Sequence, residues 1–263
     1  VLAKWKELYQ QAQLAKKYES VYASNRTGLT PPESNRVLES FYPVVDKRMP
    51  VIFKAEKNLD IHRIISLQKQ LGFSLILGDV KEGTDLIPKM KAASAKVFLS
   101  LELPEEKKKD DKKNENTSST LSAEEKEQLE KRKEESIKNL ISQPMVFQQA
   151  AVPFGFSVMS VKSKDIQPNL RRMIKAGLTE DQALTALTVH PAQLVGLSDR
   201  LGTLEVGKMA NVIVSHRPYF HTRSAVKHVF VEGVQYKIDP PTKKDANAGV
   251  VLEGSWSLTA ETP

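Results

Sequence analysis

The sequence contains no cysteine and no long apolar run, and each absence excludes a class of protein. Without cysteine, the 263-residue chain has no disulfide framework, no thiolate metal site and no cysteine nucleophile. The longest apolar stretch, residues 146–161, is broken by glutamine, proline, glycine and serine and is too short to span a bilayer. No signal peptide is recognisable. Because the chain begins with Val1 instead of methionine, we expect a fragment or a processed chain, whose compartment stays open.

Positive charge is not gathered on a surface that would suit nucleic acid. The net charge is +7, but much of the lysine lies in a charged insertion at about residues 105–142, where acidic residues alternate with lysine. Its lysine-rich part contains no aromatic residue that could stack on a base. We expect a solvated insertion, disordered over 105–120 and helical over 123–142, where Ser122 and Glu125 form a capping box. No nucleic-acid partner is predicted.

Four continuous apolar segments alternate with helical patterns from residue 49 onward. The predicted strands cover residues 50–53, 74–78, 96–100 and 152–156. The first two are followed by predicted helices at 59–71 and 85–93. Continuous apolar runs are typical of parallel strands that are covered on both faces. The sequence therefore predicts an α/β protein with a barrel or an open sheet.

Helices are predicted on both sides of this alternating region. Apolar residues at three-and-four spacing indicate a helix over residues 5–18, and a second helix over 34–42 is expected to end before Pro43. A helix is also expected to begin after Pro144, separate from the helix of the insertion.

The segment after the last predicted strand has its own helix signals. Thr179 and Gln182 form a capping box at the start of a helix. We expect His190 to cap a short helix that Pro191 opens, since proline is tolerated at the first helical position.

The chain changes character at residue 201, where apolar and polar residues begin to alternate. Three glycines, Gly202, Gly207 and Gly233, suit tight turns between antiparallel strands over residues 201–238. Residues 239–263 are interpreted as a linker and the start of a further β segment.

A long stretch, "AGLTEDQALTALTVHPAQLVGLSDRLGTLEVGKMANVIV" at residues 176–214, resembles the C-terminal segment of the amidohydrolase superfamily, in its imidazolonepropionase-like and adenine-deaminase-like branch. The positions that match the family pattern are Gly177, Leu178, Ala183, Leu184, Thr188, Pro191, Ala192, Gly196, Gly202, Leu204, Gly207, Lys208 and Ala210. Two positions depart from it, with His190 in place of asparagine and Asn211 in place of aspartate.

The resemblance implies an α/β fold that is only half complete. Residues 1–200 would form the second half of a TIM-like (β/α)8 barrel, strands five to eight, with the charged insertion in it. Residues 201–238 would form part of a small β-sandwich, the composite domain of the family. The N-terminal half of the barrel would then come from another segment, from a second chain or from a homo-oligomer.

The family's chemistry is metal-dependent hydrolysis of C–N bonds other than peptide bonds, with zinc or another divalent metal as cofactor. The resemblance places Lys54 at the histidine ligand of the fifth strand, the Gly78–Asp79 turn at that of the sixth, and Ser157 at the aspartate of the eighth. An ammonium group has no lone pair for a metal ion. We therefore predict a degenerate site without metal or cofactor, in which the charge of Lys54 neutralises acidic groups such as Asp79.

Other interpretations of these residues stay open. Lys54 would suit a Schiff-base or general-base role if burial lowered its pKa. Asp79 would suit a surviving metal ligand, a helix cap or a solvated loop residue. The histidines are interpreted as structural or surface residues, namely His62, His190, His216, His221 and His228.

Two hypotheses for function follow. One is a degenerate amidohydrolase-like domain that serves as a structural or binding module. The other is an active metal-dependent amidohydrolase whose ligands come from the missing half. The chain also resembles the degenerate first copy in long bacterial proteins with two amidohydrolase units in tandem. On that resemblance we expect a periplasmic or secreted bacterial protein, although its substrate cannot be read from the residues.

Overall fold

The computed structural model describes residues 2–104 and 123–238 of the chain. The chain divides into two compact units, Val1–Lys208 and Met209–Pro263. Three predictions lie outside the described residues: disorder over 105–120, the Ser122 cap, and a further β segment in the tail. None of the helices in the described part of the chain is long and apolar enough to cross a membrane.

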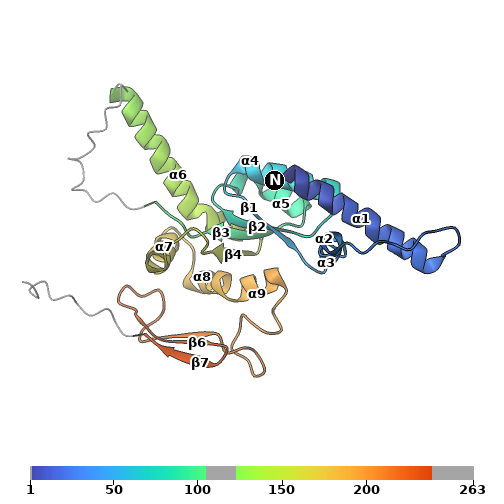
Figure 1. Cartoon of the computed structure of the whole chain (residues 1–263). Coiled ribbons are helices and arrows are strands. Elements are labelled where there is room, and N and C mark those ends of the chain that lie inside the picture. The colour runs from blue at the N-terminus through green and yellow to red at the C-terminus, as the bar shows by residue number, and fades with distance from the viewer. Residues whose placement is uncertain (1, 105–122, 239–263) are drawn as a thin grey trace, which may run out of the picture. The chain divides into compact units, whose positions relative to one another are not determined.

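The first unit is built on a parallel sheet of four strands in sequential order (Figure 1). The strands are β1 (Val51–Lys54), β2 (Leu75–Val80), β3 (Lys96–Ser100) and β4 (Phe154–Ser157). The predicted strands and their parallel pairing are confirmed, with shifts of one to two residues at most ends. Parallel strands in unbroken order, each joined to the next through helices, are what one half of an α/β barrel provides.

The helices of the first unit lie between and beside these strands. The connections contain α4 (Asn58–Leu71), the short 3₁₀ helix η1 (Thr84–Leu86), α5 (Ile87–Ala92) and α6 (Ala123–Gln149). After β4 come α7 (Ser163–Lys175), α8 (Glu180–Leu187) and α9 (Val189–Val195). The chain opens with α1 (Leu2–Ser24), α2 (Arg36–Glu39) and α3 (Tyr42–Val45). The capping box of Thr179 and Gln182 at α8 is confirmed.

Two prolines do not end helices where the sequence predicted. Pro43 lies in the first turn of α3, where its missing N–H leaves no bond unmade, and the predicted helix over 34–42 is broken earlier, between α2 and α3. Pro144 lies inside α6, so the insertion helix and the helix expected after Pro144 are one continuous element. A proline inside a helix removes one backbone hydrogen bond, and the contacts that α6 makes with α7 and η1 offset that loss.

The start of α9 also differs from the prediction. Thr188 is the N-cap residue, and His190 lies inside the first turn instead of capping it. The His190 Nδ1 atom lies 3.1 Å from the carbonyl oxygen of Phe154 in β4. His190 therefore ties α9 to the sheet through its side chain.

The sheet is buried unevenly. All six residues of β2 are buried, as expected for a central parallel strand. In β1, however, exposed and half-buried residues alternate, and Ile52 is 60% exposed. The prediction that both faces of every strand are covered is wrong for β1, which lies at the edge of the sheet and whose Ile52 side is left open by the described residues.

The covered face of β1 is held by aromatic rings. The Trp5 ring of α1 lies 5.6 Å from that of Phe53 in β1 and 5.3 Å from that of Phe73, which precedes β2. Tyr9, one turn further along α1, stacks on Trp5 at 5.3 Å and is buried. Offset and edge-on ring pairs add to the free energy gained from apolar burial. This cluster fixes α1 against the start of the sheet.

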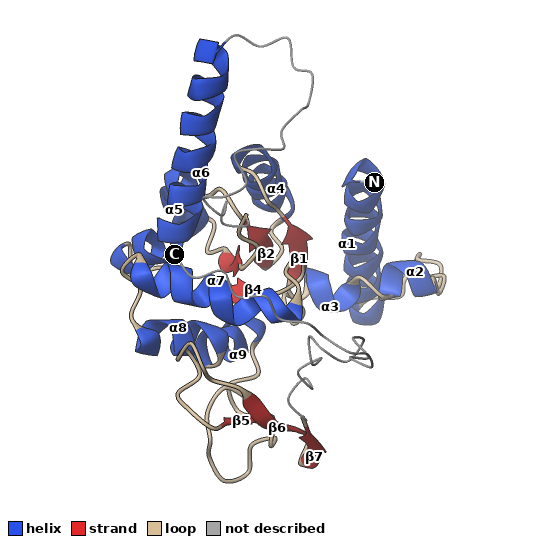
Figure 2. Ribbon diagram, turned by 90° about the vertical axis from the view of Figure 1, so that its left-hand side faces the viewer, coloured by secondary structure: helices blue, strands red, loops and turns tan. Residues whose placement is uncertain are grey.

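The second unit contains a three-stranded antiparallel sheet of β5 (Val212–Ser215), β6 (Val226–Val231) and β7 (Val234–Lys237), drawn in red in Figure 2. The antiparallel strands predicted for residues 201–238 are confirmed from Val212 onward, whereas residues 201–211 contain turns and no strand. Glu232 and Gly233, both at positive φ, form the two-residue turn between β6 and β7. Two successive positive φ angles give the turn whose twist suits a tight hairpin.

Candidate functional site

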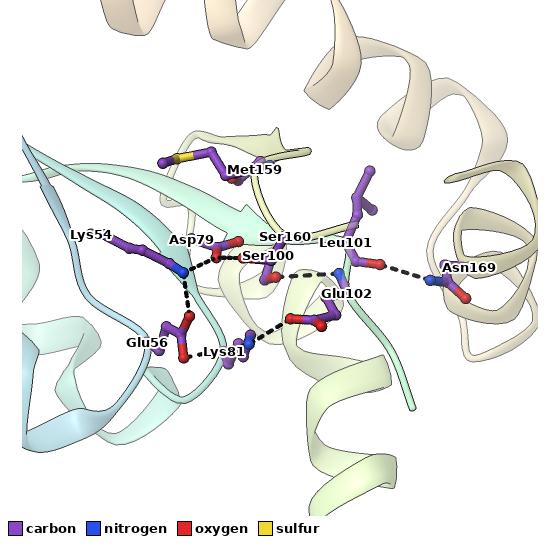
Figure 3. Close-up of polar contacts among 11 residues, drawn as sticks. Lys54, Glu56, Asp79, Lys81, Ser100, Leu101, Glu102, Met159, Ser160 and Asn169 are labelled. Carbon is purple, nitrogen blue, oxygen red and sulfur yellow. Dashed lines mark hydrogen bonds and ion pairs between the residues drawn. The ribbon is translucent and has the colours of Figure 1, made fainter. Parts of the chain in front are cut away.

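The three residues singled out by the sequence all lie at the carboxyl ends of strands. Lys54 is the last residue of β1, Asp79 is the last but one of β2, and Ser157 is the last of β4. The carboxyl ends of parallel strands meet at one edge of the sheet, where α/β barrel enzymes place their reactive groups. The structure brings Lys54 and Asp79 into contact and leaves Ser157 outside that contact (Figure 3).

Asp79 is fully buried and has an unusual backbone conformation. Its φ is 60°, and the pairing of β2 with β3 shifts between Leu77 and Val80. Asp79 therefore lies in a bulge within β2. The sequence had suggested a turn after the strand instead. A left-handed residue in a strand costs free energy and is found where side-chain direction matters. Here the bulge directs a carboxylate into the sheet edge.

Groups from two other segments contact one oxygen of this carboxylate. The Ser160 hydroxyl, three residues after β4, donates to Asp79 Oδ2 at 2.5 Å (Figure 3). The Ser100 hydroxyl at the end of β3 lowers the pKa of the same carboxyl group. The Lys54 Nζ atom lies 3.5 Å from the same Oδ2. The other oxygen, Oδ1, is buried and has no hydrogen-bond partner among the described residues.

Lys54 begins a chain of alternating charges along the strand ends. Its Nζ is 2.6 Å from Glu56 Oε1, and Glu56 Oε2 is 3.5 Å from the Nζ of Lys81. Lys81 Nζ in turn lies 2.6 Å from Glu102 Oε2. We call this set the strand-end network. Its members are Lys54, Glu56, Asp79, Lys81, Ser100, Glu102 and Ser160.

The network shifts the pKa of its carboxylates down and the pKa of its lysines up, and both shifts favour the charged forms. Burial by itself raises the pKa of Asp79, but the hydrogen bonds from Ser160 and Ser100, helped by the two ammonium groups, hold it below its usual value. The hydrogen bond to Glu56 raises the pKa of Lys54 above its usual value, and the charges of Glu56 and Asp79 add to it. A Schiff-base or general-base lysine needs a lowered pKa, so this environment disfavours both roles.

Lys81 and Glu56 follow the same rule. Burial lowers the pKa of Lys81, but the hydrogen bond to Glu102 and the charges of Glu102 and Glu56 outweigh it and raise the pKa. The hydrogen bond from Lys54 lowers the pKa of Glu56. Each charge is therefore stabilised by its neighbours, and the network keeps its ionised form over a wider range of pH than isolated groups would.

Ser157 has a local role. Its hydroxyl accepts a hydrogen bond from the backbone N–H of Met159 at 3.3 Å, and its carbonyl oxygen accepts one from the N–H of Leu101. Ser157 is the register partner of Ser100. These bonds fix the turn that carries Ser160 to Asp79, so Ser160 reaches the carboxylate and Ser157 does not.

Sequence reasoning missed most of the strand-end network, although a signal was present. Three consecutive strands end in a polar residue followed two positions later by a charged one: "KAE" at 54–56, "DVK" at 79–81 and "SLE" at 100–102. Residues two apart in an extended chain point to the same side. Opposite charges at that spacing on neighbouring strands predict ion pairs across the sheet edge.

The residues present do not fit a divalent metal. In the described ranges, 2–104 and 123–238, no group of three or more His, Asp or Glu side chains is arranged to hold an ion. The carboxylates of Glu56, two residues after β1, and of Asp79 in β2 both contact the Lys54 ammonium, whose positive charge opposes a cation between them. His216 and His221 contact the nearby backbone groups of Ala225 and Arg223.

Comparison with known proteins gives a family match for part of the chain and a fold for most of it. Residues 136–236 match the sequence model of the amidohydrolase family. An amidohydrolase from Thermotoga maritima superposes with a TM-score of 0.66 at 18% identity, over 90% of this chain and 55% of that chain. A prolidase solved with N-methylphosphonate-L-proline gives 0.50 at 15% identity, over 78% of this chain and 48% of that one. No curated protein matches the sequence.

The extent of these matches agrees with half a barrel. The chain spans about half the length of the solved structures that it matches. Its four parallel strands are consistent with part of a TIM-like barrel. Residues 136–236 thus carry the sequence pattern of the amidohydrolase family, in a chain with the fold of solved amidohydrolases.

Proposed function

We propose that this chain is the second half of an amidohydrolase-type barrel, of the imidazolonepropionase-like branch, in which the strand-end network replaces the metal centre. The half would serve as a structural or ligand-binding module. One observation carries the proposal: the Lys54 ammonium lies 3.5 Å from the buried carboxylate of Asp79, at the edge where barrel enzymes carry out their chemistry. The Lys54 ammonium would thus supply the positive charge that a metal ion supplies in the family's enzymes.

The energetics of the buried carboxylate support this assignment. A buried charge without compensation is strongly destabilising, whereas a charge with an ion pair and hydrogen bonds is tolerated. Asp79 accepts a hydrogen bond from the Ser160 hydroxyl in the turn after β4, and its ammonium partner comes from β1. The carboxylate thus holds two other segments to β2 and stabilises the sheet edge without a cofactor.

The exposed edges of the sheet support the missing half as a partner. β1 and β4 each pair on one side only, and the side chains of Ile52 in β1 and of Val158 and Met159 after β4 are exposed. Unpaired strand edges and exposed apolar side chains favour association. We propose that a further segment or a second chain, as in a tandem bacterial amidohydrolase, completes the barrel and carries any hydrolysis of C–N bonds.

A second candidate rests on the unsatisfied oxygen of Asp79. Oδ1 is buried and accepts no hydrogen bond from the described residues, so it has a lone pair to offer a ligand. An active metal-dependent amidohydrolase whose remaining ligands come from the missing half would use this atom.

Metal binding separates the two candidates when the chain is assayed within the complete protein, because the second candidate draws its remaining ligands from the missing half. After dialysis against zinc or manganese, we expect far less than one equivalent by elemental analysis. Lys54→His, which restores the family's residue type, should bind no more than Lys57→His, a matched change at an exposed lysine nearby. One equivalent in the unchanged protein, lost in Asp79→Ala, would favour the second candidate and refute the first.

A further inference from the structure

The loop that joins β5 to β6 carries positive charge and no acidic residue. We call residues 216–225, "HRPYFHTRSA", the basic loop. It contains Arg217 and Arg223 together with two histidines, and no Asp or Glu occurs anywhere between Glu205 and Glu232. A guanidinium group keeps its charge at any physiological pH. The basic loop therefore carries two positive charges that no neighbour in the sequence neutralises.

The two guanidinium groups of the basic loop are open to a ligand. Arg217 and Arg223 are both exposed, and in the described part of the chain neither side chain forms an ion pair or a hydrogen bond. Arg48, by contrast, lies 3.1 Å from Asp46. A guanidinium group offers a planar fork of N–H donors, so two such groups without partners form a surface that suits an oxyanion.

Hydrogen bonds and a buried ring fix the shape of the basic loop. The carbonyl oxygen of Arg217 accepts hydrogen bonds from the hydroxyls of Ser215 at 2.6 Å and Ser224 at 3.1 Å. These bonds tie one arm of the loop to the other, so the main chain of Arg217 lies beside the residue that follows Arg223. Phe220, in the middle of the loop, is buried. The two arginines therefore start from neighbouring points of an ordered backbone, which reduces the entropy lost on binding.

The two histidines add donors with a fixed orientation. The backbone N–H of Arg223 donates to Nδ1 of His221 at 3.1 Å, and that of Ala225 donates to Nδ1 of His216 at 3.1 Å. The latter nitrogen makes a longer contact, at 3.3 Å, with the carbonyl oxygen of Ala225. A ring nitrogen that accepts a hydrogen bond carries no proton, so each neutral ring keeps its N–H on Nε2. Both histidines are exposed and thus turn a donor away from the backbone of the loop.

We propose that the basic loop binds the phosphate group of a phosphate monoester, with Arg217 and Arg223 as the charged contacts and His216 and His221 as further donors. A phosphate monoester carries close to two negative charges at neutral pH and has three terminal oxygens that accept hydrogen bonds. It therefore matches two guanidinium charges and several donors. A carboxylate, with one charge and two oxygens, would leave half of the positive charge uncompensated. None of the residues of the strand-end network takes part.

An NMR titration of the isotope-labelled full chain with methyl phosphate tests this site. We expect saturable shifts of the arginine and backbone N–H signals of the basic loop. At constant ionic strength, the affinity should be at least about tenfold higher than for acetate, because acetate makes fewer charge-assisted hydrogen bonds. The absence of saturable shifts at millimolar methyl phosphate would overturn the proposal, and so would equal affinity for the two ions. Tighter binding of a short single-stranded DNA at the same phosphate concentration would also overturn it, since phosphodiesters would then be the preferred ligand.

Neutral substitutions inside and outside the basic loop locate the contact. Arg217→Gln and Arg223→Gln should each weaken the binding of methyl phosphate by about tenfold, because each removes a charge-assisted contact. Arg200→Gln, at an exposed arginine after α9, removes the same charge elsewhere and should change the affinity by less than about twofold. Equal losses in all three variants would mean that the ion responds only to net charge, and the proposal would be wrong.

A lysine at the same position separates geometry from charge. Arg217→Lys keeps the positive charge but loses the fork of donors, so it should bind methyl phosphate several-fold more weakly than the unchanged chain. The Arg217 side chain forms no hydrogen bond or ion pair with the described residues, so none of these variants should alter the urea midpoint of the chain. If Arg217→Lys binds methyl phosphate as tightly as the unchanged chain does, the site does not use the guanidinium fork and the assignment fails.

Discussion

In the four-stranded sheet of the first unit every residue of β2 is buried, whereas in the three-stranded sheet of the second unit every residue of β7 is exposed. The central strand of the first sheet is covered within its own unit, whereas the edge strand β1 keeps Ile52 exposed. The second sheet has no helix in its described part. The comparison shows that the core around β2 is covered by its own unit, whereas the strands of the second sheet are largely open in the described residues.

The largest effect should come from truncating the buried sheet. Leu77 lies in the centre of β2 with no exposed surface. Leu77→Ala should reduce the free energy of unfolding by about 3 kcal/mol, because it removes buried methyl groups and leaves a cavity. Urea unfolding of the full chain measures this. A loss as small as that caused by Leu197→Ala, a change at a partly exposed leucine after α9, would mean that the first core is not close-packed.

The next effect should come from the strand-end network. Ser160→Ala removes the hydroxyl that donates to the buried Asp79 carboxylate at 2.5 Å. We expect a loss of about 2 kcal/mol, since a hydrogen bond to a buried charged group contributes more than a neutral one. Ser163→Ala, at the exposed start of α7, is the control and should cost much less. Equal costs would show that the carboxylate does not depend on Ser160.

The strand ends could be located from the sequence, but not all of the residues that contact them. Continuous apolar runs predicted all four parallel strands, because a buried strand needs apolar residues on both faces. The proximity of Lys54 and Asp79 could be expected, since they end neighbouring strands. Ser160 could not, because its approach to Asp79 depends on the turn that Ser157 fixes and on the bulge that reorients Asp79.

The helix errors have a related cause. Rules for proline describe what the local backbone prefers, and they predicted ends before Pro43 and at Pro144. In the structure, Pro43 lies in the first turn of a helix, where proline is tolerated, and Pro144 is carried within a long helix that packs against α7. Tertiary contacts of this kind are not visible in a window of sequence.

A smaller effect, on the pH dependence of stability, is expected at Asp79 in the first sheet. The folded-state pKa of Asp79 is lowered, so its contribution to stability is complete above its unfolded pKa of about 4 and is lost as the pH falls through the lower folded-state value. Asp79→Asn should therefore make stability less dependent on pH below about 4. Asparagine keeps the shape and accepts a left-handed φ. Glu56, whose pKa is also lowered, should leave some dependence in place.

Urea midpoints at several pH values between about 2.5 and 6 would measure this difference. Asp199→Asn, at an exposed carboxylate after α9, serves as the control and should keep the acid dependence of the unchanged protein. The assignment would fail if both variants gave the same acid dependence.

The smallest effect should be that of the C-terminal residues on the first core. Deletion of residues 249–263 should change the urea unfolding of the first unit by no more than about 0.5 kcal/mol, because that unit is built from residues 1–208. A large loss in the first unit would show that its core is not self-sufficient and would remove the contrast between the two sheets.

The left-handed backbone of Asp79 limits which residues could ever replace it. Glycine enters this conformation freely, asparagine and histidine enter it more readily than most residues, and valine or isoleucine would be severely strained. In a library of all substitutions at position 79, the stability of the variants should therefore depend on main-chain geometry as well as on charge. Variants with glycine or asparagine should be more stable than the variant with glutamate. Mutational drift at this position is thus confined to a few side chains, several of them able to donate or accept a proton.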